Sequence, residues 1–334
     1  MKTTDRNLAA RIVAIRELPA LVLFAGLFVY FALHAPEFAN AADLADRFRQ
    51  YVPQAMLAVA LTLIIGSGGI DISVGSVLGL CTVVLGAVTL RGVGPAHACL
   101  LAVATGCAIG AFNGLAVAKI RLQPVVVTLS TWGAARGLCY VIAGRNTSIT
   151  LPPTLSVLYE SPAPIVLAIA VILTGVLILH STVLGRGILA VGGSEQAARF
   201  SGINVAGVKL RLYTFAGAMA GLAAIVTAGW MNTASTEAGK GYEFEAITAV
   251  LIGGTSIYGG EASVIGSMFG VAAIAILSRG FGLMAVSEHW QRLFLGLILI
   301  ASVLLDRLRR SYELRVAGRK TPGRDSVVEV VDVN

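Results

Sequence analysis

Charge is scarce in this sequence: only 13% of the 334 residues are charged, while 56% are hydrophobic. A soluble protein carries roughly 25% charged residues, so this chain has about half the charge needed to cover a soluble surface. The scarcity excludes a water-soluble fold. The 38 glycines suit close approach between helices in lipid. We therefore predict an all-α, polytopic helical membrane protein.

The sequence also lacks the usual signatures of metal, disulfide and nucleotide sites. Its four cysteines lie in apolar runs without a C-x-x-C spacing, which favours buried structural thiols, and its four histidines form no cluster. It contains no Gly-x-x-x-x-Gly-Lys-[Ser/Thr] motif, so we do not expect it to bind ATP itself. We expect no catalytic residue, no metal, no cofactor and no nucleic-acid partner.

Apolar runs predict about ten transmembrane helices within a membrane domain of residues 18–305. A basic N-terminal segment, 1–17, precedes this domain and a tail, 306–334, follows it. The predicted spans are residues 18–33, 56–65, 77–90, 97–118, 125–142, 165–179, 212–230, 246–252, 268–277 and 294–305.

The net charge of +7 is concentrated in a few basic clusters between these spans. Counting spans from a cytoplasmic N-terminus puts Lys119 and Arg121, the loop 181–211 and the C-terminal tail on the cytoplasmic side. Each cluster then obeys the positive-inside rule. We predict a multi-pass protein of a bacterial inner membrane with both termini in the cytoplasm.

A Gly-rich stretch, residues 66–76, interrupts one of the longest apolar tracts. Broken backbone at membrane depth is tolerated only where protein buries it or where it lines a watery cavity, and an ionisable residue there suggests a functional site. The alternative is a tight turn at the membrane surface with a solvated carboxylate. The predicted pathway residues of this first break are Gly68, Gly69, Asp71, Ser73 and Gly75.

A second stretch, residues 253–267, repeats the pattern of glycines, one carboxylate and a following Ser-Val segment. Paired breaks in two halves of a chain are a pointer to a transporter's pathway, although chance glycine enrichment is the alternative. We expect the two breaks to lie close together, and Asp71 to face the interior with backbone amides of the break or Arg136 as its partner. The predicted pathway residues of this second break are Gly253, Gly254, Thr255, Ser256, Gly260 and Glu261.

The loop 181–211 contains the pattern of a short capped helix. Ser194 is a candidate N-cap, Glu195 occupies the first turn and Gly202 is a candidate C-terminal stop. A short helix in the longest predicted cytoplasmic loop suggests a docking point for a partner; the alternative is an interfacial helix on lipid headgroups. The docking residues are predicted to be Gly193, Ser194, Glu195, Gln196, Ala197, Ala198, Arg199, Gly202 and Ile203.

Three motifs together resemble the ribose-type permeases of bacterial ABC sugar importers. They are Gly-Gly-Ile-Asp-Ile-Ser-Val-Gly at 68–75, the segment 184–203, and Ala-Val-Leu-Ile-Gly-Gly-Thr-Ser at 249–256. The likeness extends from about residue 18 to residue 307. The Ala-Ala-x-x-x-Gly part of an importer coupling loop is matched at 197–202, but the Ile-x-Leu-Pro that ends it in other importer families is missing.

The resemblance implies a permease subunit that forms the translocation pathway for a monosaccharide. A periplasmic sugar-binding protein would deliver the sugar, a separate ATPase would supply energy, and a second permease subunit would complete a homodimer or heterodimer. Ala197 and Ala198 would enter a groove of the ATPase, and Arg199 would pair with one of its acidic residues. The alternatives are a branched-chain amino acid permease, an ion-coupled secondary transporter and an intramembrane hydrolase. The sequence does not identify the sugar.

Overall fold

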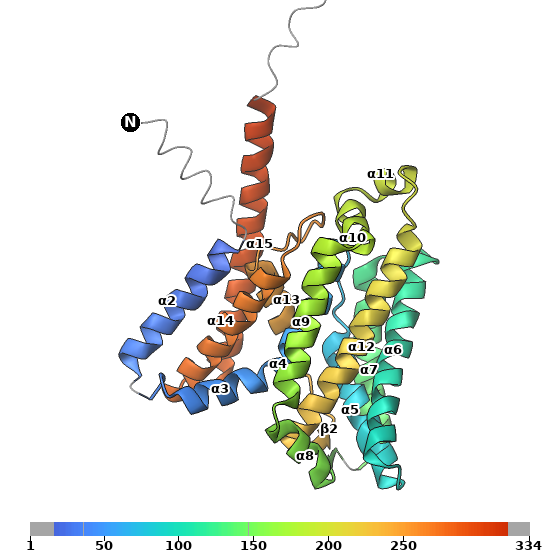
Figure 1. Ribbon diagram of the computed structural model, residues 1–334, viewed down its shortest axis with the longest axis vertical. Helices are drawn as coiled ribbons and strands as arrows, with labels where there is room; N and C mark the ends of the chain where they lie inside the picture. Colours follow the sequence, from blue (N-terminus) through green and yellow to red (C-terminus); the bar gives the residue numbers. More distant parts are fainter. Residues whose placement is uncertain (1–16, 36, 146, 320–334) are drawn as a thin grey trace, which may run out of the picture.

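The computed structural model describes residues 17–35, 37–145 and 147–319, and these residues form a bundle of helices (Figure 1). Its helices are α2 (Leu18–His34), α3 (Ala41–Gln50), α4 (Val52–Gly66), α5 (Val74–Leu90), α6 (Pro95–Ala118), α7 (Pro124–Ala143), α8 (Pro153–Glu160), α9 (Ala163–Ser181), α10 (Val183–Gly193), α11 (Glu195–Phe200), α12 (Val205–Met231), α13 (Tyr242–Ile252), α14 (Val264–Leu283) and α15 (Glu288–Arg319).

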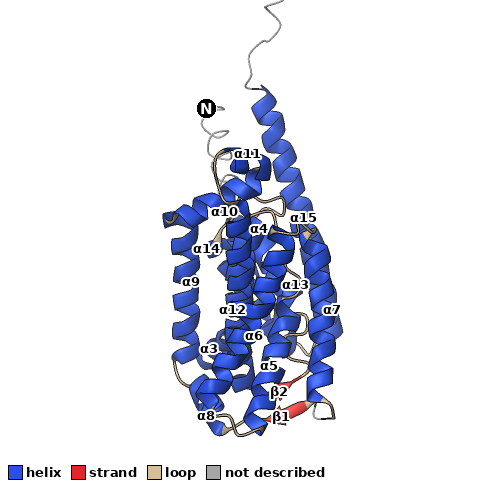
Figure 2. Ribbon diagram, turned by 90° about the vertical axis from the view of Figure 1, so that its right-hand side faces the viewer, coloured by secondary structure: helices blue, strands red, loops and turns tan. Residues whose placement is uncertain are grey.

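Two short strands pair at one end of the bundle. β1 (Ser148–Thr150) runs antiparallel to β2 (Thr233–Ser235), with Ile149 opposite Ala234. Figure 2 shows this pair and α8 at one end, which we call the strand end, and α11 at the opposite end, which we call the α11 end.

All ten predicted apolar runs lie in helices, but ten membrane crossings are not confirmed. Among the described residues, five helices are long and apolar enough to cross a membrane, or six if the bent pair α3 and α4 forms one span. Three further apolar helices, α2, α5 and α10, are shorter. For example, α2 and α5 have 17 residues each and are therefore about 25 Å long, against a hydrocarbon core of about 30 Å.

Helix α4 is the centre of the bundle. All 15 of its residues are buried, and its neighbours include α9, α12, α13 and α14. A helix that is hydrophobic on every side is expected to be buried on every side, which explains why this run has no polar face. Because the first Gly-rich break follows directly from α4, the core of the protein fixes where the break begins.

The segment 181–211 is more ordered than a single polar loop. It forms α10, then α11, then the first turns of α12, which begins at Val205 rather than at the predicted residue 212. Gly185 and Ile188 of α10 are buried, so α10 packs against the bundle. Likewise α15 continues to Arg319 instead of ending at the predicted residue 305. The N-terminal segment 1–16 and residues 320–334 lie outside the described residues.

Candidate functional site

The first break turns the chain sharply at the end of α4. Gly68 has a φ of +79°, a left-handed conformation that favours glycine. Gly69 lies so close to Tyr213 that a Cβ there would be 2.9 Å from the Tyr213 hydroxyl. Residues 69–72 then run without helical structure to the start of α5. The break therefore separates α4 from α5 by a non-helical segment that carries Asp71.

Asp71 is buried, with 2% of its surface exposed, as predicted for a carboxylate facing the interior. Its Oδ1 accepts from the Ser73 amide at 2.8 Å and from the Ser73 hydroxyl at 2.6 Å. Asn113 of α6 donates to the Ser73 hydroxyl at 3.0 Å, and Thr131 of α7 donates to the Asn113 carbonyl at 2.6 Å. A continuous polar chain thus joins the first break to two neighbouring helices. The predicted backbone-amide partner of Asp71 is confirmed.

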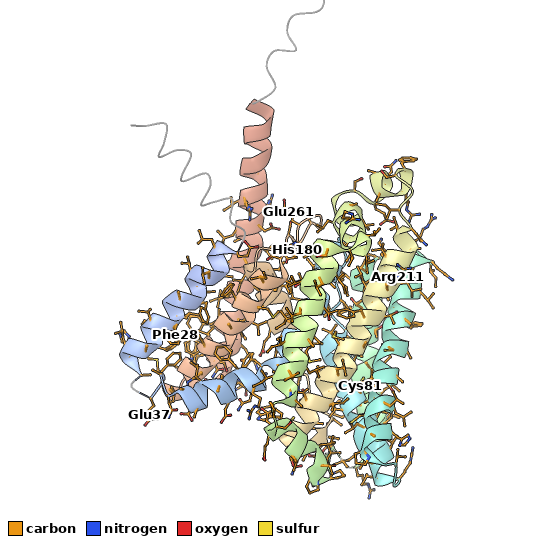
Figure 3. The ribbon with its side chains drawn as sticks, viewed as in Figure 1. Phe28, Glu37, Cys81, His180, Arg211 and Glu261 are labelled. Carbon is orange, nitrogen blue, oxygen red and sulfur yellow. The ribbon has the colours of Figure 1, made fainter. Side chains whose placement is uncertain are left out.

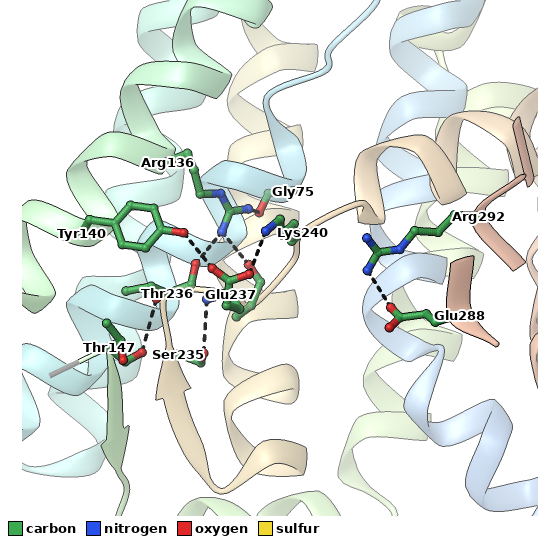
Figure 4. A network of polar contacts seen from close by, with 11 residues as sticks. Gly75, Arg136, Tyr140, Thr147, Ser235, Thr236, Glu237, Lys240, Glu288 and Arg292 are labelled. Atoms are coloured by element: carbon green, nitrogen blue, oxygen red, sulfur yellow. Dashed lines mark hydrogen bonds and ion pairs between the residues drawn. The ribbon is translucent and has the colours of Figure 1, made fainter. Parts of the chain in front are cut away.

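The alternative prediction, that Arg136 is the partner of Asp71, is wrong. Arg136 donates instead to backbone carbonyls, those of Thr236 at 2.7 Å, Ala238 at 3.1 Å and Gly75 at 3.4 Å (Figure 4). These three carbonyls lie 61 to 102 residues from Arg136 in the sequence. Two of them belong to the segment that follows β2, so the guanidinium binds that segment.

Gly75 lets that segment approach α5. A Cβ at Gly75 would overlap the Glu243 carboxylate and the Gly239 carbonyl, so this position accepts no side chain. Glu243 is buried and accepts a hydrogen bond from the Trp132 indole at 3.0 Å. The role indicated for Gly75 is close packing between α5 and the start of α13.

The second break has partners of a different kind. Its backbone turns at Gly254, Gly259 and Gly260, with φ between +78° and +87°. Asp306 of α15 accepts from the Ser256 hydroxyl at 3.0 Å and from the Ile257 amide at 3.1 Å.

Ser263 closes the second break and starts α14. Its hydroxyl accepts from the Gly266 amide at 3.0 Å as an N-cap and donates to Glu17 at 2.8 Å, while its amide donates to the Thr255 hydroxyl at 3.2 Å. Glu261 is partly exposed and lies toward the α11 end (Figure 3). The second carboxylate is therefore not buried like Asp71.

The two breaks touch each other, which confirms their predicted proximity. The Gly260 amide donates to the Gly66 carbonyl at 2.9 Å. A Cβ at Gly259 would be 2.8 Å from the Gly68 Cα. Hydroxyls also join the flanking helices, since those of Thr62 in α4 and Ser267 in α14 are 2.7 Å apart.

Helix α11 has the predicted caps. The Ser194 hydroxyl accepts from the Ala197 amide at 3.2 Å, and Gly202 follows the helix with a φ of +80°. The prediction for Ala198 is wrong: it is 3% exposed and packs with Val191 and Val205 of this chain. The chain doubles back after α10, and this return buries the Ala198 side of so short a helix.

Arg199 also has its acidic partner within this chain. Glu195 forms ion pairs with Arg199 at 2.6 Å and with Lys209 of α12 at 2.5 Å. Partial burial acts to raise the pKa of Glu195, but the hydrogen bonds and charges of Lys209 and Arg199 outweigh it, so the pKa is lowered. The exposed side chains of α11 are Gln196, Ala197, Arg199 and Phe200, and Phe200 is 84% exposed.

Several residues of this site have no counterpart in the sequence predictions. Glu17 and Asp306 hold the second break, and Asn113 and Thr131 extend the chain from Asp71. The signal for Asn113 was its position as an amide inside an otherwise apolar helix. No group of three or more His, Cys, Asp or Glu side chains in the described ranges could hold a metal ion.

Comparison with known proteins identifies the family. Residues 44–303 match the family described as "Branched-chain amino acid transport system / permease component". The chain is 33% identical over 295 residues to the ribose import permease protein of Bacillus subtilis (strain 168), covering 85% of this chain and 91% of that protein. It is 35% identical over 285 residues to the ribose import permease protein of Escherichia coli (strain K12), covering 83% and 89%.

A relative with another cargo is the fructose import permease protein of Rhizobium meliloti, 30% identical over 303 residues that cover 86% of this chain and 84% of that protein. No solved structure matches the chain significantly. The fold, the paired breaks and these relatives agree, and the chain belongs to the family of ABC importer permeases that includes the ribose and fructose import permeases.

Proposed function

We propose that this chain is the inner-membrane permease of an importer that carries a monosaccharide, delivered by a periplasmic binding protein and driven by a separate ATPase. The observation that carries the proposal is the identity of 33–35% to ribose import permeases over more than four fifths of the chain. The names of the relatives favour a sugar cargo over the branched-chain amino acids named in the family's description.

The α11 end faces the cytoplasm in this proposal. Basic residues of the segments at this end include Lys119, Arg186, Lys209 and Arg211, and Figure 3 shows Arg211 on that side, with Glu37 near the opposite end. The positive-inside rule supports this orientation. The strand end then faces the periplasm and the binding protein.

We assign to the pathway the buried polar chain that joins Asp71 and Ser73 of the first break to Asn113 of α6 and Thr131 of α7. Buried polar groups are costly in a membrane and mark functional sites there. The predicted pathway glycines act through backbone geometry, because each either has little or no room for a side chain or has a left-handed φ. They are Gly68, Gly69, Gly75, Gly253, Gly254 and Gly260. Thr255 and Ser256 hold the second break in shape through Ser263 and Asp306.

The ATPase docks on the exposed face of α11 in this account. That face presents Phe200 and Ala197, while Ala198 anchors the helix to α10 and α12. A large exposed aromatic side chain on a rigid capped helix is the kind of anchor that dominates protein interfaces.

The second permease subunit packs against α7. Gly133 and Gly137, one turn apart, are exposed and have nothing within 4 Å of a Cβ built on them, whereas the one glycine of α9, Gly175, is buried. Small residues four apart favour close helix packing.

Uptake into reconstituted vesicles tests the proposal. We expect labelled ribose or fructose to accumulate only when the ATPase, ATP and the binding protein are all present. Uptake of branched-chain amino acids alone, or uptake driven by an ion gradient without the ATPase, would contradict it.

Autoinducer 2 is a second candidate cargo, because an autoinducer 2 import system permease of Yersinia pseudotuberculosis is 34% identical over 271 residues, 79% of this chain and 77% of that protein. Adding unlabelled autoinducer 2 to the uptake of labelled sugar distinguishes the two cargoes. Inhibition of sugar uptake would favour autoinducer 2, and unchanged uptake would favour the sugar.

A further inference from the structure

Three distant segments meet through their glycines beside α11. Gly66 and Gly68 belong to the first break, Gly192 is in the last turn of α10, and Gly259 and Gly260 belong to the second break. We call these five residues the glycine junction.

The junction packs backbone against backbone. A Cβ at Gly192 would overlap both the Gly66 carbonyl and the Gly260 amide. A Cβ at Gly259 would be 2.8 Å from the Gly68 Cα and 2.9 Å from the Gly192 Cα. The Gly260–Gly66 hydrogen bond crosses the same place. Side chains could absorb a small displacement by changing rotamer, but backbone in direct contact transmits it.

Helix α10 connects this junction to α11. Ser194, the residue between the two helices, donates its amide to the Ala190 carbonyl of α10 at 3.1 Å. Ala198 of α11 packs on Val191, which immediately precedes Gly192. A displacement of α11 therefore moves the last turn of α10, and Gly192 with it.

We propose that the glycine junction is the contact through which α11 displaces both broken helices together. This inference rests on the proposed docking of an ATPase at α11. On the first break, the displaced backbone lies three residues before Asp71, so the polar chain of Asp71 and Ser73 changes position with α11. Gly192 is a positioning residue in this account, because it touches both breaks and carries no chemistry of its own.

Two helical glycines supply a matched pair of variants, Gly192 of α10 and Gly282 of α14. Neither has a left-handed φ, and a Cβ at Gly282 has nothing within 4 Å. In the reconstituted complex, we expect Gly192→Ala to lower ATP-driven uptake about tenfold while ATP hydrolysis and ATPase co-purification stay near wild type. Gly282→Ala should behave as wild type. Coupled uptake at the wild-type level in Gly192→Ala would overturn the proposal, as would loss of ATPase binding, since that result indicates a purely structural role.

Hydrogen exchange in the unmodified complex tests the same link if Gly192→Ala does not fold. Nucleotide binding to the ATPase should change exchange in peptides covering 66–73 and 254–262 together with 190–203, and leave the exposed helix α9 unchanged. A change confined to 190–203 would overturn the junction's role while uptake still supports the permease. Absence of nucleotide-dependent uptake in the wild type would instead contradict the proposed function itself.

Discussion

The two breaks share a sequence pattern but place their serines and carboxylates in different surroundings. In the first, Ser73 donates its hydroxyl to Asp71 and accepts from Asn113, so it leaves α5 without a side-chain cap. In the second, Ser263 caps α14 and donates to Glu17. The repeat therefore specifies where helices break, while contacts with the rest of the chain decide what each break does.

The helices around the breaks differ as well. Helices α13 and α14 fold back on each other through glycines: a Cβ at Gly266 would overlap the Gly253 carbonyl, and one at Gly270 would overlap the Ala249 carbonyl. Between α4 and α5, by contrast, residues 69–72 form a segment without helical structure. The second break is a tight hairpin at the α11 end, and the first carries a carboxylate into the interior.

The largest effect is expected where the hairpin is tightest. In Gly253→Val, the new side chain would overlap the backbone of Gly266 and Ser267, and overpacking of this kind costs about 1–3 kcal/mol or more. We expect loss of folded protein, measured by the monodisperse yield in detergent. Gly282→Val on α14 is the control, because nothing lies within 4 Å of a Cβ there. Equal yields would show that the hairpin is looser than described.

The next largest effect is the difference in uptake between variants of the two carboxylates, Asp71 and Glu261. Asp71→Asn removes the charge from a buried group whose hydrogen bonds are worth about 1.5–3 kcal/mol, so uptake should fall at least ~tenfold while membrane insertion is retained. Glu261→Gln, at a partly exposed position, should stay within about twofold of wild type. Initial uptake rates at equal permease density measure both. Similar losses in the two variants would make the breaks functionally equivalent.

A smaller effect is expected at the anchor of the second break. Asp306→Ala removes the acceptor of two hydrogen bonds, from the Ser256 hydroxyl and the Ile257 amide, at a local cost of about 1–3 kcal/mol. Hydrogen exchange should rise in residues 254–262 and stay unchanged in residues 66–73. Unchanged protection at 254–262 would show that Asp306 does not hold this break.

The smallest difference concerns the paired serines. Ser263→Ala removes an N-cap and should lower stability by about 1 kcal/mol with little change in the affinity for sugar. Ser73→Ala removes the hydroxyl between Asp71 and Asn113 and should affect uptake more than stability. Thermal unfolding and uptake, measured on both variants, would contradict this assignment if the two serines behaved alike.

Local pattern was enough to predict the helical runs, the positions of both breaks and the caps of α11 at Ser194 and Gly202, because each depends on residues close in sequence. It could not supply the partners of Arg136, which are carbonyls up to 102 residues away, or the contact of Glu17 with Ser263, 246 residues apart. The burial of Ala198 likewise depends on α10 and α12 returning to the same place.

Co-purification of the ATPase with the Phe200→Ser permease tests most directly the claim that an ATPase drives this chain through α11. Phe112→Ser is the control, because Phe112 is a similarly exposed phenylalanine, 63% exposed on α6. The account predicts that Phe200→Ser loses both bound ATPase and ATP-driven uptake while Phe112→Ser retains them. Full ATPase binding and uptake in Phe200→Ser would contradict the account and favour α11 lying on lipid headgroups.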